Sequence, residues 1–345
     1  MTIIIKDKGA VRLRAEGTYG TNPGSFADAD TVFAKSLEVD SKVEAIEVDG
    51  ITARRNGLPD ISGEENNTFK VITELNPVAV AAPTPVTSRS LCHKWLEIGG
   101  FEITDATVAN NLEYKLCDYD FPSYTMEYFQ RNKAGTGGRK WVGTGARADS
   151  VIKAERGQLV MLELDGQFKE LTPTDDTTTI APVYQDTNSE KRLSLDMVSG
   201  VSVTILASTP SGVVSFSGKF LSMEIRTNNK LATVRNSADD IQEILPIGGK
   251  PEVDLKIEHT QIADFDYRGY RNGAKDSLAW VVTVDARDAT SGTTDSVSFA
   301  GTAYINDVED SFEDERLVVN LKATSGWSSS GTEDQQLSVT FSTAP

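Results

Sequence analysis

The chain has 345 residues, a formal net charge of −17 and a sequence pI near 4.6. This length suggests two domains, and a hydrophobic content of 39% is typical of folded chains rather than disordered ones. The acidic excess excludes the class of proteins that bind the outside of a nucleic acid through clustered Lys and Arg. It fits two interpretations, solubility or a surface that repels DNA, and charge alone does not separate them.

The N-terminus carries a charge at Lys6 and lacks the continuous apolar stretch of a signal peptide. No stretch of the chain approaches the ~20 apolar residues that a membrane-spanning helix needs. We therefore expect no membrane span and a protein made and kept in a cytoplasm. Cys92 and Cys117 are too far apart for a zinc-type pair, so two unpaired buried thiols are favoured over one disulfide.

In the first half, period-2 alternation and turn clusters predict mainly β-structure. The expected elements, in chain order, are a strand pair near Val32–Val48, a long polar loop at Gly50–Asn67, a strand at Asn66–Leu75, a short helix at Ser88–Ile98, and a hairpin made of Tyr124–Gln130 and Gly145–Leu164. The helix would place Leu91, Trp95 and Ile98 on one face after a Ser cap.

The second half shows the same kind of alternation. We expect strands at Phe216–Arg226, Glu252–Glu258, Leu278–Asp285, Gly301–Leu321 and Leu337–Phe341, with a short helix at Ser237–Leu245. Asp239 and Asp240 would lie in the first turn of that helix, where carboxylates favour the positive end of the dipole. The acidic run Asp307–Glu315 is interpreted as a solvated turn between two strands, because it lacks the glycine and spacing of a calcium loop.

The two halves follow a similar order of elements. Gly145–Val151 followed by Leu159–Leu164 resembles Gly301–Val308 followed by Leu317–Leu321, although a duplication remains open on pattern alone. The Thr-, Asp- and Pro-rich segment Leu171–Glu190 is the expected linker. The predicted domains are residues 1–180 and 190–345.

The sequence offers little catalytic chemistry. His93 and His259 are the only histidines, and His93 cannot face its neighbour Cys92 on a helix. Gly135–Gly138 and Gly143–Ala146 lead into a strand rather than a helix, which argues against a phosphate-binding loop. We predict no catalytic residue, no metal and no cofactor.

Several short motifs occur in the order found in phage tail tube (major tail) proteins, over roughly residues 11–260. They are Glu16–Thr21, which is similar to an E-x-T-Y-G opening, then Glu47–Gly57, Phe69–Leu75, the helix region Pro83–Gly99, Ser123–Tyr128, Gly143–Gly157, and Phe216–Asn229. The chain resembles the larger, two-domain members of that family.

This resemblance implies tandem β-sandwich or barrel domains, each with about one short flanking helix. Subunits of such proteins join their sheets edge to edge into rings, which stack into a tube. Two domains per chain imply a ring of three copies with pseudo-six-fold symmetry. The implied partners are further copies of the chain, the tape-measure, terminator and distal tail proteins, and DNA that passes through the lumen without specific binding. The implied location is the virion tail, assembled in the host cytoplasm.

Two sets of residues are candidates for these roles. The loop Gly50–Asn67 is longer than an ordinary hairpin connection and is expected to reach a neighbouring subunit. Its candidate contact residues are Arg54, Arg55, Asn56, Asp60, Glu64 and Glu65. The second set consists of acids on alternating strands that would repel DNA from the lumen wall, namely Glu163, Asp165, Glu252, Asp254 and Glu258.

Other functions remain open at this stage. The nearest is another β-sandwich virion component, such as a decoration or baseplate protein. A carbohydrate-binding or adhesion module is disfavoured by the missing signal peptide and the scattered tryptophans Trp95, Trp141, Trp280 and Trp327. A hydrolase on a β-scaffold is disfavoured by the supply of only two histidines.

Overall fold

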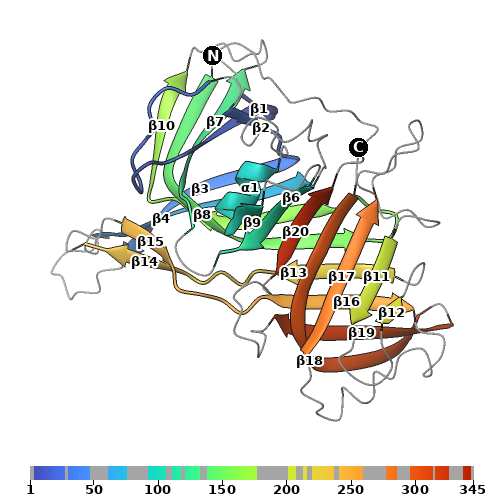
Figure 1. Ribbon diagram of the computed structural model, residues 1–345. Coiled ribbons are helices and arrows are strands. Elements are labelled where there is room, and N and C mark those ends of the chain that lie inside the picture. The colour runs from blue at the N-terminus through green and yellow to red at the C-terminus, as the bar shows by residue number, and fades with distance from the viewer. Residues whose placement is uncertain are drawn as a thin grey trace.

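The structure is a computed structural model. It describes residues 4–27, 30–46, 61–75, 92–105, 111–117, 121–132, 138–176, 201–206, 213–215, 220–236, 241–258, 277–285, 296–313, 315–325 and 337–342. Within these ranges the protein is mainly β, as the sequence predicts (Figure 1). No helix in the described ranges has the length and apolarity that a membrane span requires.

The first half contains one helix and ten strands in the described residues. They are β1 (Ile4–Ala15), β2 (Thr31–Val32), β3 (Ser36–Ile46), β4 (Ile61–Glu74), α1 (His93–Ile98), β5 (Phe101–Asp105), β6 (Asn111–Leu116), β7 (Tyr124–Asn132), β8 (Gly138–Glu155), β9 (Met161–Gln167) and β10 (Glu170–Asp176). The second half contributes β11 (Val201–Leu206), β12 (Val213–Ser215), β13 (Phe220–Arg226), β14 (Leu231–Arg235), β15 (Ile241–Pro246), β16 (Glu252–Glu258), β17 (Ser277–Asp285), β18 (Ser296–Glu313), β19 (Arg316–Ser325) and β20 (Ser338–Ser342).

The alternating segments form strands because one face of each can be buried. Leu162 and Leu164 of β9 are buried, and the neighbouring acids Glu163 and Asp165 are not. On β16, the buried residues are Val253, Leu255 and Ile257. The strands predicted in these two regions are therefore confirmed, together with the buried face that the period-2 pattern implies.

The predicted helix near Ser88–Ile98 is confirmed only as the shorter α1. Residues 88–91 lie outside the described ranges, and Cys92 occupies the N-cap without a side-chain capping hydrogen bond. Trp95 and Ile98, which the prediction places on one face of the helix, are both buried. The Trp95 indole N–H donates to the Phe33 carbonyl at 2.9 Å, which ties the helix to the segment before β3.

Four other predictions need correction. The helix expected at Ser237–Leu245 is wrong from residue 241 onward, because those residues form β15. The loop expected at Gly50–Asn67 ends earlier, because β4 begins at Ile61. The linker cannot begin at Leu171, because β10 continues to Asp176. The acidic run from Asp307 is mostly strand, since β18 continues to Glu313, and Glu315 lies in a turn before β19. Asp307, Glu309 and Glu313 lie on one side of this strand, and Val308 and Phe312 lie on the other side together with Asp310.

Two long strands organise the molecule. β8 and β18 are each 18 residues long, and each belongs to two layers. The first part of β8 pairs with β7 and β10, and its second part pairs with β9 and β13. The first part of β18 pairs with β17 and β20, and its second part pairs with β19.

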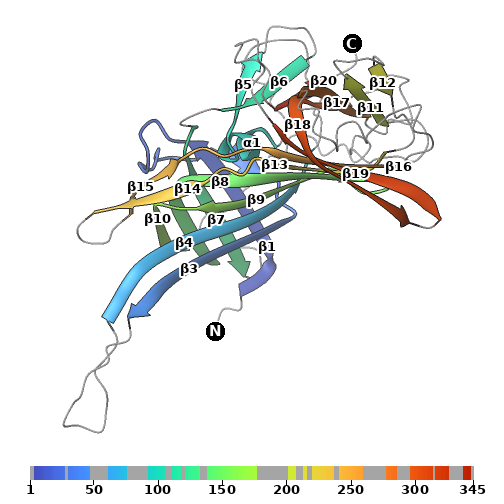
Figure 2. The same cartoon turned by 90° about the horizontal axis from the view of Figure 1, so that it is seen from below.

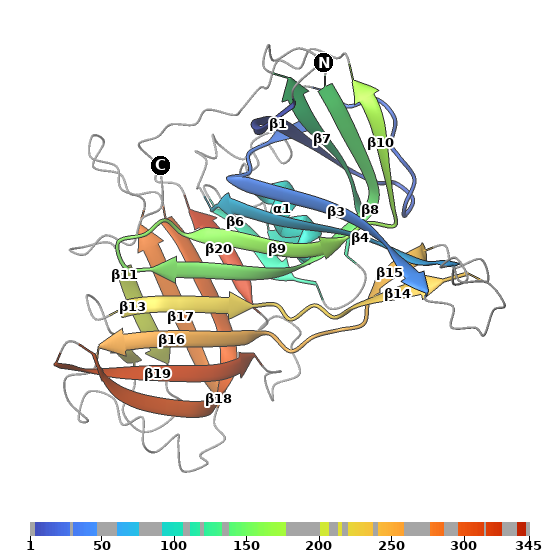
Figure 3. The same ribbon diagram turned by 180° about the vertical axis from the view of Figure 1, so that it is seen from behind.

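The second parts of both strands belong to one layer, which we call the shared layer. Its strand order is β3–β4–β9–β8–β13–β16–β19–β18. Figure 3 shows these strands crossing the molecule one beside the next. All pairs in the layer are antiparallel.

The strand pairing of the first half is repeated in the second. In the first half β1 pairs with β7, β7 with β8, and β8 with β9 and β10, while β3 pairs with β4 and β4 with β9. In the second half β11 pairs with β17, β17 with β18, and β18 with β19 and β20, while β13 pairs with β16 and β16 with β19. The repetition is compatible with tandem domains, and the predicted boundary at residues 180–190 lies outside the described ranges. The two halves also contact each other where β20 of the second half pairs with β6 of the first.

Candidate assembly surface

The shared layer has one polar face that runs across both halves. Directly paired residues of antiparallel strands point to the same side, and one row of such pairs runs Glu163–Val151–Arg226–Glu252. The next row runs Lys153–Glu224–Asp254–Lys322. The five acids predicted to line a lumen therefore share this single polar face.

Each of these five acids is bound to a basic side chain. The Lys153 ammonium lies 2.6 Å from Glu163, and Lys70 lies 2.9 Å from Asp165. Arg226 lies 3.1 Å from Asp254 and 3.8 Å from Glu252, and Arg316 lies 3.2 Å from Glu258. The sequence pattern located the acids on one face but gave no sign of this pairing.

Acidic side chains still outnumber basic ones on the polar face. The acids placed there by the pairing registers are Glu38, Asp40, Glu74, Asp149, Glu155, Glu163, Asp165, Glu224, Glu252, Asp254, Glu258, Asp307, Glu309 and Glu313. The bases are Lys42, Lys70, Arg147, Lys153, Arg226, Lys256, Arg316 and Lys322. The face is a mixed ion-pair lattice with an excess of negative charge.

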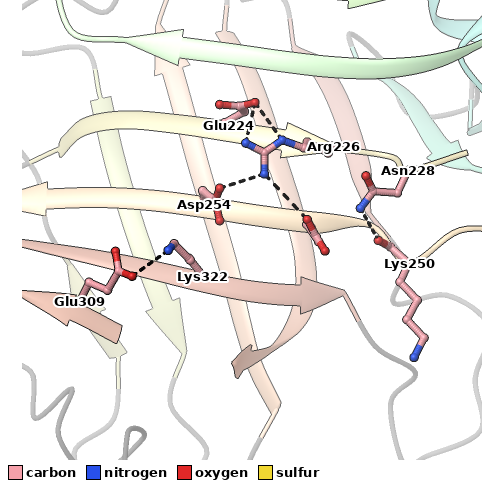
Figure 4. A network of polar contacts seen from close by, with 8 residues as sticks. Glu224, Arg226, Asn228, Lys250, Asp254, Glu309 and Lys322 are labelled. Carbon is pink, nitrogen blue, oxygen red and sulfur yellow. Dashed lines mark hydrogen bonds and ion pairs between the residues drawn. The ribbon is translucent and has the colours of Figure 1, made fainter. Parts of the chain in front are cut away.

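Arg226 is the centre of this lattice (Figure 4). It also pairs with Glu224 at 2.9 Å, so it binds carboxylates of its own strand and of β16. Burial lowers the pKa of Arg226, but the carboxylates of Glu224 and Asp254 outweigh that effect and raise its pKa. Hydrogen bonds to Asp165 and Glu309 likewise raise the pKa values of Lys70 and Lys322. Lys70, Arg226 and Lys322 therefore stay charged and bound to carboxylates.

The pairing of β8 with β13 joins the halves within the shared layer; we call it the internal joint. Ala154 pairs with Met223, and Ile152 pairs with Ile225. All four side chains are buried. The joint thus has a dry apolar side opposite its polar face.

A carboxylate closes one end of the internal joint. Asp149 accepts the Thr227 hydroxyl at 2.7 Å, the Asn229 backbone N–H at 2.7 Å and the Ser150 backbone N–H at 2.9 Å. Asn229 in turn donates from its amide to the Gly99 carbonyl at 2.8 Å. These bonds fix the chain where it leaves β13.

The hairpin of β14 and β15 packs back onto the first half. The Tyr19 hydroxyl accepts the Ile244 N–H at 2.8 Å, and Arg147 donates to the Ile244 carbonyl at 2.6 Å. The Arg147 guanidinium also lies 4.8 Å from the centre of the Tyr19 ring. Burial raises the pKa of Tyr19 to about 12.

Glu16, the first residue of the Glu16–Thr21 motif, accepts four hydrogen bonds near this hairpin. Its carboxylate accepts the N–H groups of Gly20 at 2.7 Å and Gly145 at 2.8 Å. It also accepts the hydroxyls of Ser123 at 2.6 Å and Thr125 at 2.7 Å. The motif therefore has a structural role, in which one carboxylate fastens the loop after β1 to β7 and β8.

The candidate contact loop is only partly described. Arg54, Arg55, Asn56 and Asp60 lie outside the described residues. Glu64 and Glu65 do not lie in a loop, because they belong to β4, and Glu65 pairs with Val43 of β3. Figure 2 shows β3 and β4 extending together as an arm beyond the rest of the shared layer.

His93, Cys92 and Cys117 lie within the described residues, and their contacts are those of residues that support the fold. His93 is buried, with Nδ1 2.7 Å from the Tyr114 hydroxyl and Nε2 3.3 Å from Glu97. Cys92 is buried and Cys117 half-buried, and neither of them forms a disulfide. His259 lies outside the described ranges. Among the described side chains, no group of three or more His, Cys, Asp or Glu residues is placed to hold a metal ion.

Sequence reasoning missed the residues at the two ends of the shared layer. Leu37 lies on β3 at one end, and Phe312 lies on β18 at the other. The available signal was the likeness of Ser36–Asp40 (SLEVD) to Ser222–Arg226 (SMEIR), which shows its meaning only once β3 and β13 are known to be equivalent strands.

A scan of protein-family models finds no match to this chain, and a search of curated proteins finds none either.

Proposed function

We propose that this chain is a structural protein that assembles into stacked rings and forms the tail tube of a virus, through which DNA passes into the host. The observation that supports this proposal best is the shared layer. Two equivalent sets of strands lie edge to edge in it, as neighbouring subunits would in a ring wall. In this proposal three copies supply six such sets, which gives a trimeric ring with pseudo-six-fold symmetry.

The polar face of the shared layer suits a lumen wall. Each phosphate that a Lys or Arg neutralises adds affinity and would slow DNA that slides past. Lys70, Lys153 and Arg226 are already bound to carboxylates, and the face keeps an excess of acids. We propose that Glu163, Asp165, Glu252, Asp254 and Glu258 belong to this wall.

The remaining contacts follow from the same proposal. The arm of β3 and β4 would reach a neighbouring ring, and the proposed contact residues are Arg54, Arg55, Asn56, Asp60, Glu64 and Glu65. Tape-measure, terminator and distal tail proteins would be the other partners, within a virion tail assembled in the host cytoplasm. No cofactor and no enzymatic activity form part of this proposal.

Negative-stain electron microscopy of the purified protein at high concentration tests the proposal. We expect rings or tubes with a central channel. Monodisperse particles at every concentration, or solid fibres without a channel, would overturn it. Particles that stay monomeric and bind immobilised carbohydrate would instead support an adhesion module.

A further inference from the structure

The shared layer ends in two strand edges, at each of which the described residues show strand pairing on one side only. β3 pairs there with β4 alone. At the other end, the part of β18 from Asp307 to Glu313 pairs with β19 alone. Such edges are templates for pairing with another chain.

The internal joint shows what each edge would accept. β13 pairs with β16, which lies beside β19, and β3 pairs with β4, which lies beside β9. β13 is therefore equivalent to β3. β8 is equivalent to β18. The molecule therefore already contains one example of a β3-type edge paired with a β18-type edge.

A shared side-chain contact fixes which residues correspond. Asp149 accepts the N–H of Ser150 at 2.9 Å, and Asp307 accepts the N–H of Val308 at 2.9 Å. With Asp307 placed at Asp149, both 18-residue strands end on equivalent glutamates, Glu155 and Glu313. The pairing registers then place Ser36–Asp40 at Ser222–Arg226.

We infer that copies of this chain join head to tail, with β3 of one copy added to the Asp307–Glu313 edge of the next in the register of the internal joint. Leu37 of one copy then pairs with Phe312 of the other, Glu38 with Ser311, and Asp40 with Glu309. This inference rests on the proposed function and specifies the joint by which the ring would close.

The apolar side chains at these edges support the inference. Phe312 is 78% exposed, whereas its counterpart Ala154 is 1% exposed inside the internal joint. Leu37 is half-buried, whereas its counterpart Met223 is 2% exposed. Phe312 against Leu37 would cover on assembly the apolar surface that Ala154 and Met223 cover on folding.

The polar end of the internal joint has its counterpart as well. Ser41 lies at the position of Thr227, so its hydroxyl would approach Asp307 as the Thr227 hydroxyl approaches Asp149. A head-to-tail contact of this kind is heterologous, and it closes into a ring when each joint turns the chain by the same angle. The same register at every joint would provide that constant angle.

Disulfide trapping tests the register. One preparation carries Glu38→Cys, a second carries Ser311→Cys, and a third carries Glu313→Cys. Directly paired residues have Cβ atoms about 4.5–5.5 Å apart, while diagonal neighbours lie about 7–8 Å apart, too far for a disulfide without backbone movement. We expect covalent dimers on mild oxidation only when the first two preparations are mixed, with the wild type as the control for Cys92 and Cys117.

Electron microscopy of the same mixtures separates the two levels of the proposal. Rings or tubes without the 38–311 link would overturn the joint and leave the proposed function standing. Links in the Glu38→Cys sample alone would indicate a two-fold contact and also overturn the joint. Absence of both assemblies and links would overturn the joint and the function together.

The Phe312 side chain allows a second test that folding does not confound. Phe312→Asp should weaken association at least about tenfold, because it removes the exposed apolar group and adds a charge. Phe312→Leu should retain assembly. Both variants should melt like the wild type under conditions that keep the chain monomeric, and unchanged assembly of Phe312→Asp would overturn the joint.

Discussion

The internal joint and the two edges of the shared layer are the same structural element in two states, paired and open. At the internal joint, Ile225 is fully buried and Arg226 is surrounded by carboxylates. Their counterparts on β3, Val39 and Asp40, are half-buried and exposed. In the joint that we infer, one strand design would serve folding in one place and assembly in another, with side chains adjusted to whether pairing is permanent.

The largest expected effect is the loss of stability when an apolar side chain is shortened at the internal joint, compared with the same change at an edge. Ile225→Ala should lower the free energy of unfolding by about 3 kcal/mol, because it leaves a cavity in a packed joint. Val39→Ala, its counterpart, should cost the monomer about 1 kcal/mol or less. Urea unfolding at low protein concentration measures both. Equal losses in the two variants would show that the joint and the edge do not differ in packing.

A second pair of variants compares the carboxylates. Asp149→Ala should cost about 2 kcal/mol of stability, because the donors of Thr227, Asn229 and Ser150 lose a charged acceptor. Asp307→Ala should change the monomer by about 0.5 kcal/mol or less and reduce assembly instead. Calorimetry and sedimentation velocity provide the two measurements. A larger stability loss for Asp307→Ala than for Asp149→Ala would contradict the correspondence.

The hairpin of β14 and β15 offers a different kind of link between the halves, and it should be sensitive to alkali. Tyr19 has a pKa raised to about 12 by burial, so the folded state holds its proton more firmly than the unfolded state. Its contribution is fully present below the ordinary tyrosine pKa of about 10 and is lost as pH rises toward 12. Tyr19→Phe should cost about 1 kcal/mol at neutral pH through the lost bond to Ile244, and it should lose less stability between about pH 9 and pH 11.5 than the wild type. Denaturant unfolding at both pH values checks this, and parallel losses in the two proteins would contradict it.

The sequence predicted the strands more reliably than their connections. Glu252–Glu258 alternates without interruption, so its strand and its buried face were readable from period alone. Ile241–Pro246 was mistaken for part of a helix because Asp239 and Asp240 are typical of a first helical turn, whereas pairing with β14 decides the conformation. Local preference could not anticipate that long-range pairing.

The candidate surface shows the same limit. Glu163 and Asp254 were recognisable as acids on polar strand faces, but only the row through β8 and β13 shows that they share one side of one layer. Phe312 lies within an acidic run that looked like a solvated turn, so nothing local marked it as an edge anchor. Its meaning depends on Ala154, a residue 158 positions earlier in the chain.

The smallest expected effect concerns charge. The internal joint mixes signs, since Glu224 and Arg226 of β13 lie beside Lys153 and Val151 of β8. The inferred joint between copies would instead bring Asp40 beside Glu309. Lys42 and Lys322 are bound to these two carboxylates and reduce the repulsion, so the net cost should stay below about 1 kcal/mol.

Salt should therefore strengthen assembly, in contrast to most contacts between opposite charges. Raising ionic strength from about 10 mM to about 150 mM shortens the screening length from roughly 30 Å to roughly 8 Å, which weakens the repulsion between Asp40 and Glu309. Asp40→Arg places at this position the charge that Arg226 has in the internal joint. That variant should assemble more tightly than the wild type at low salt and should lose affinity as salt is added. Sedimentation velocity across the salt series gives both slopes, and a wild-type association constant that falls with salt would show that attraction, not repulsion, dominates the joint.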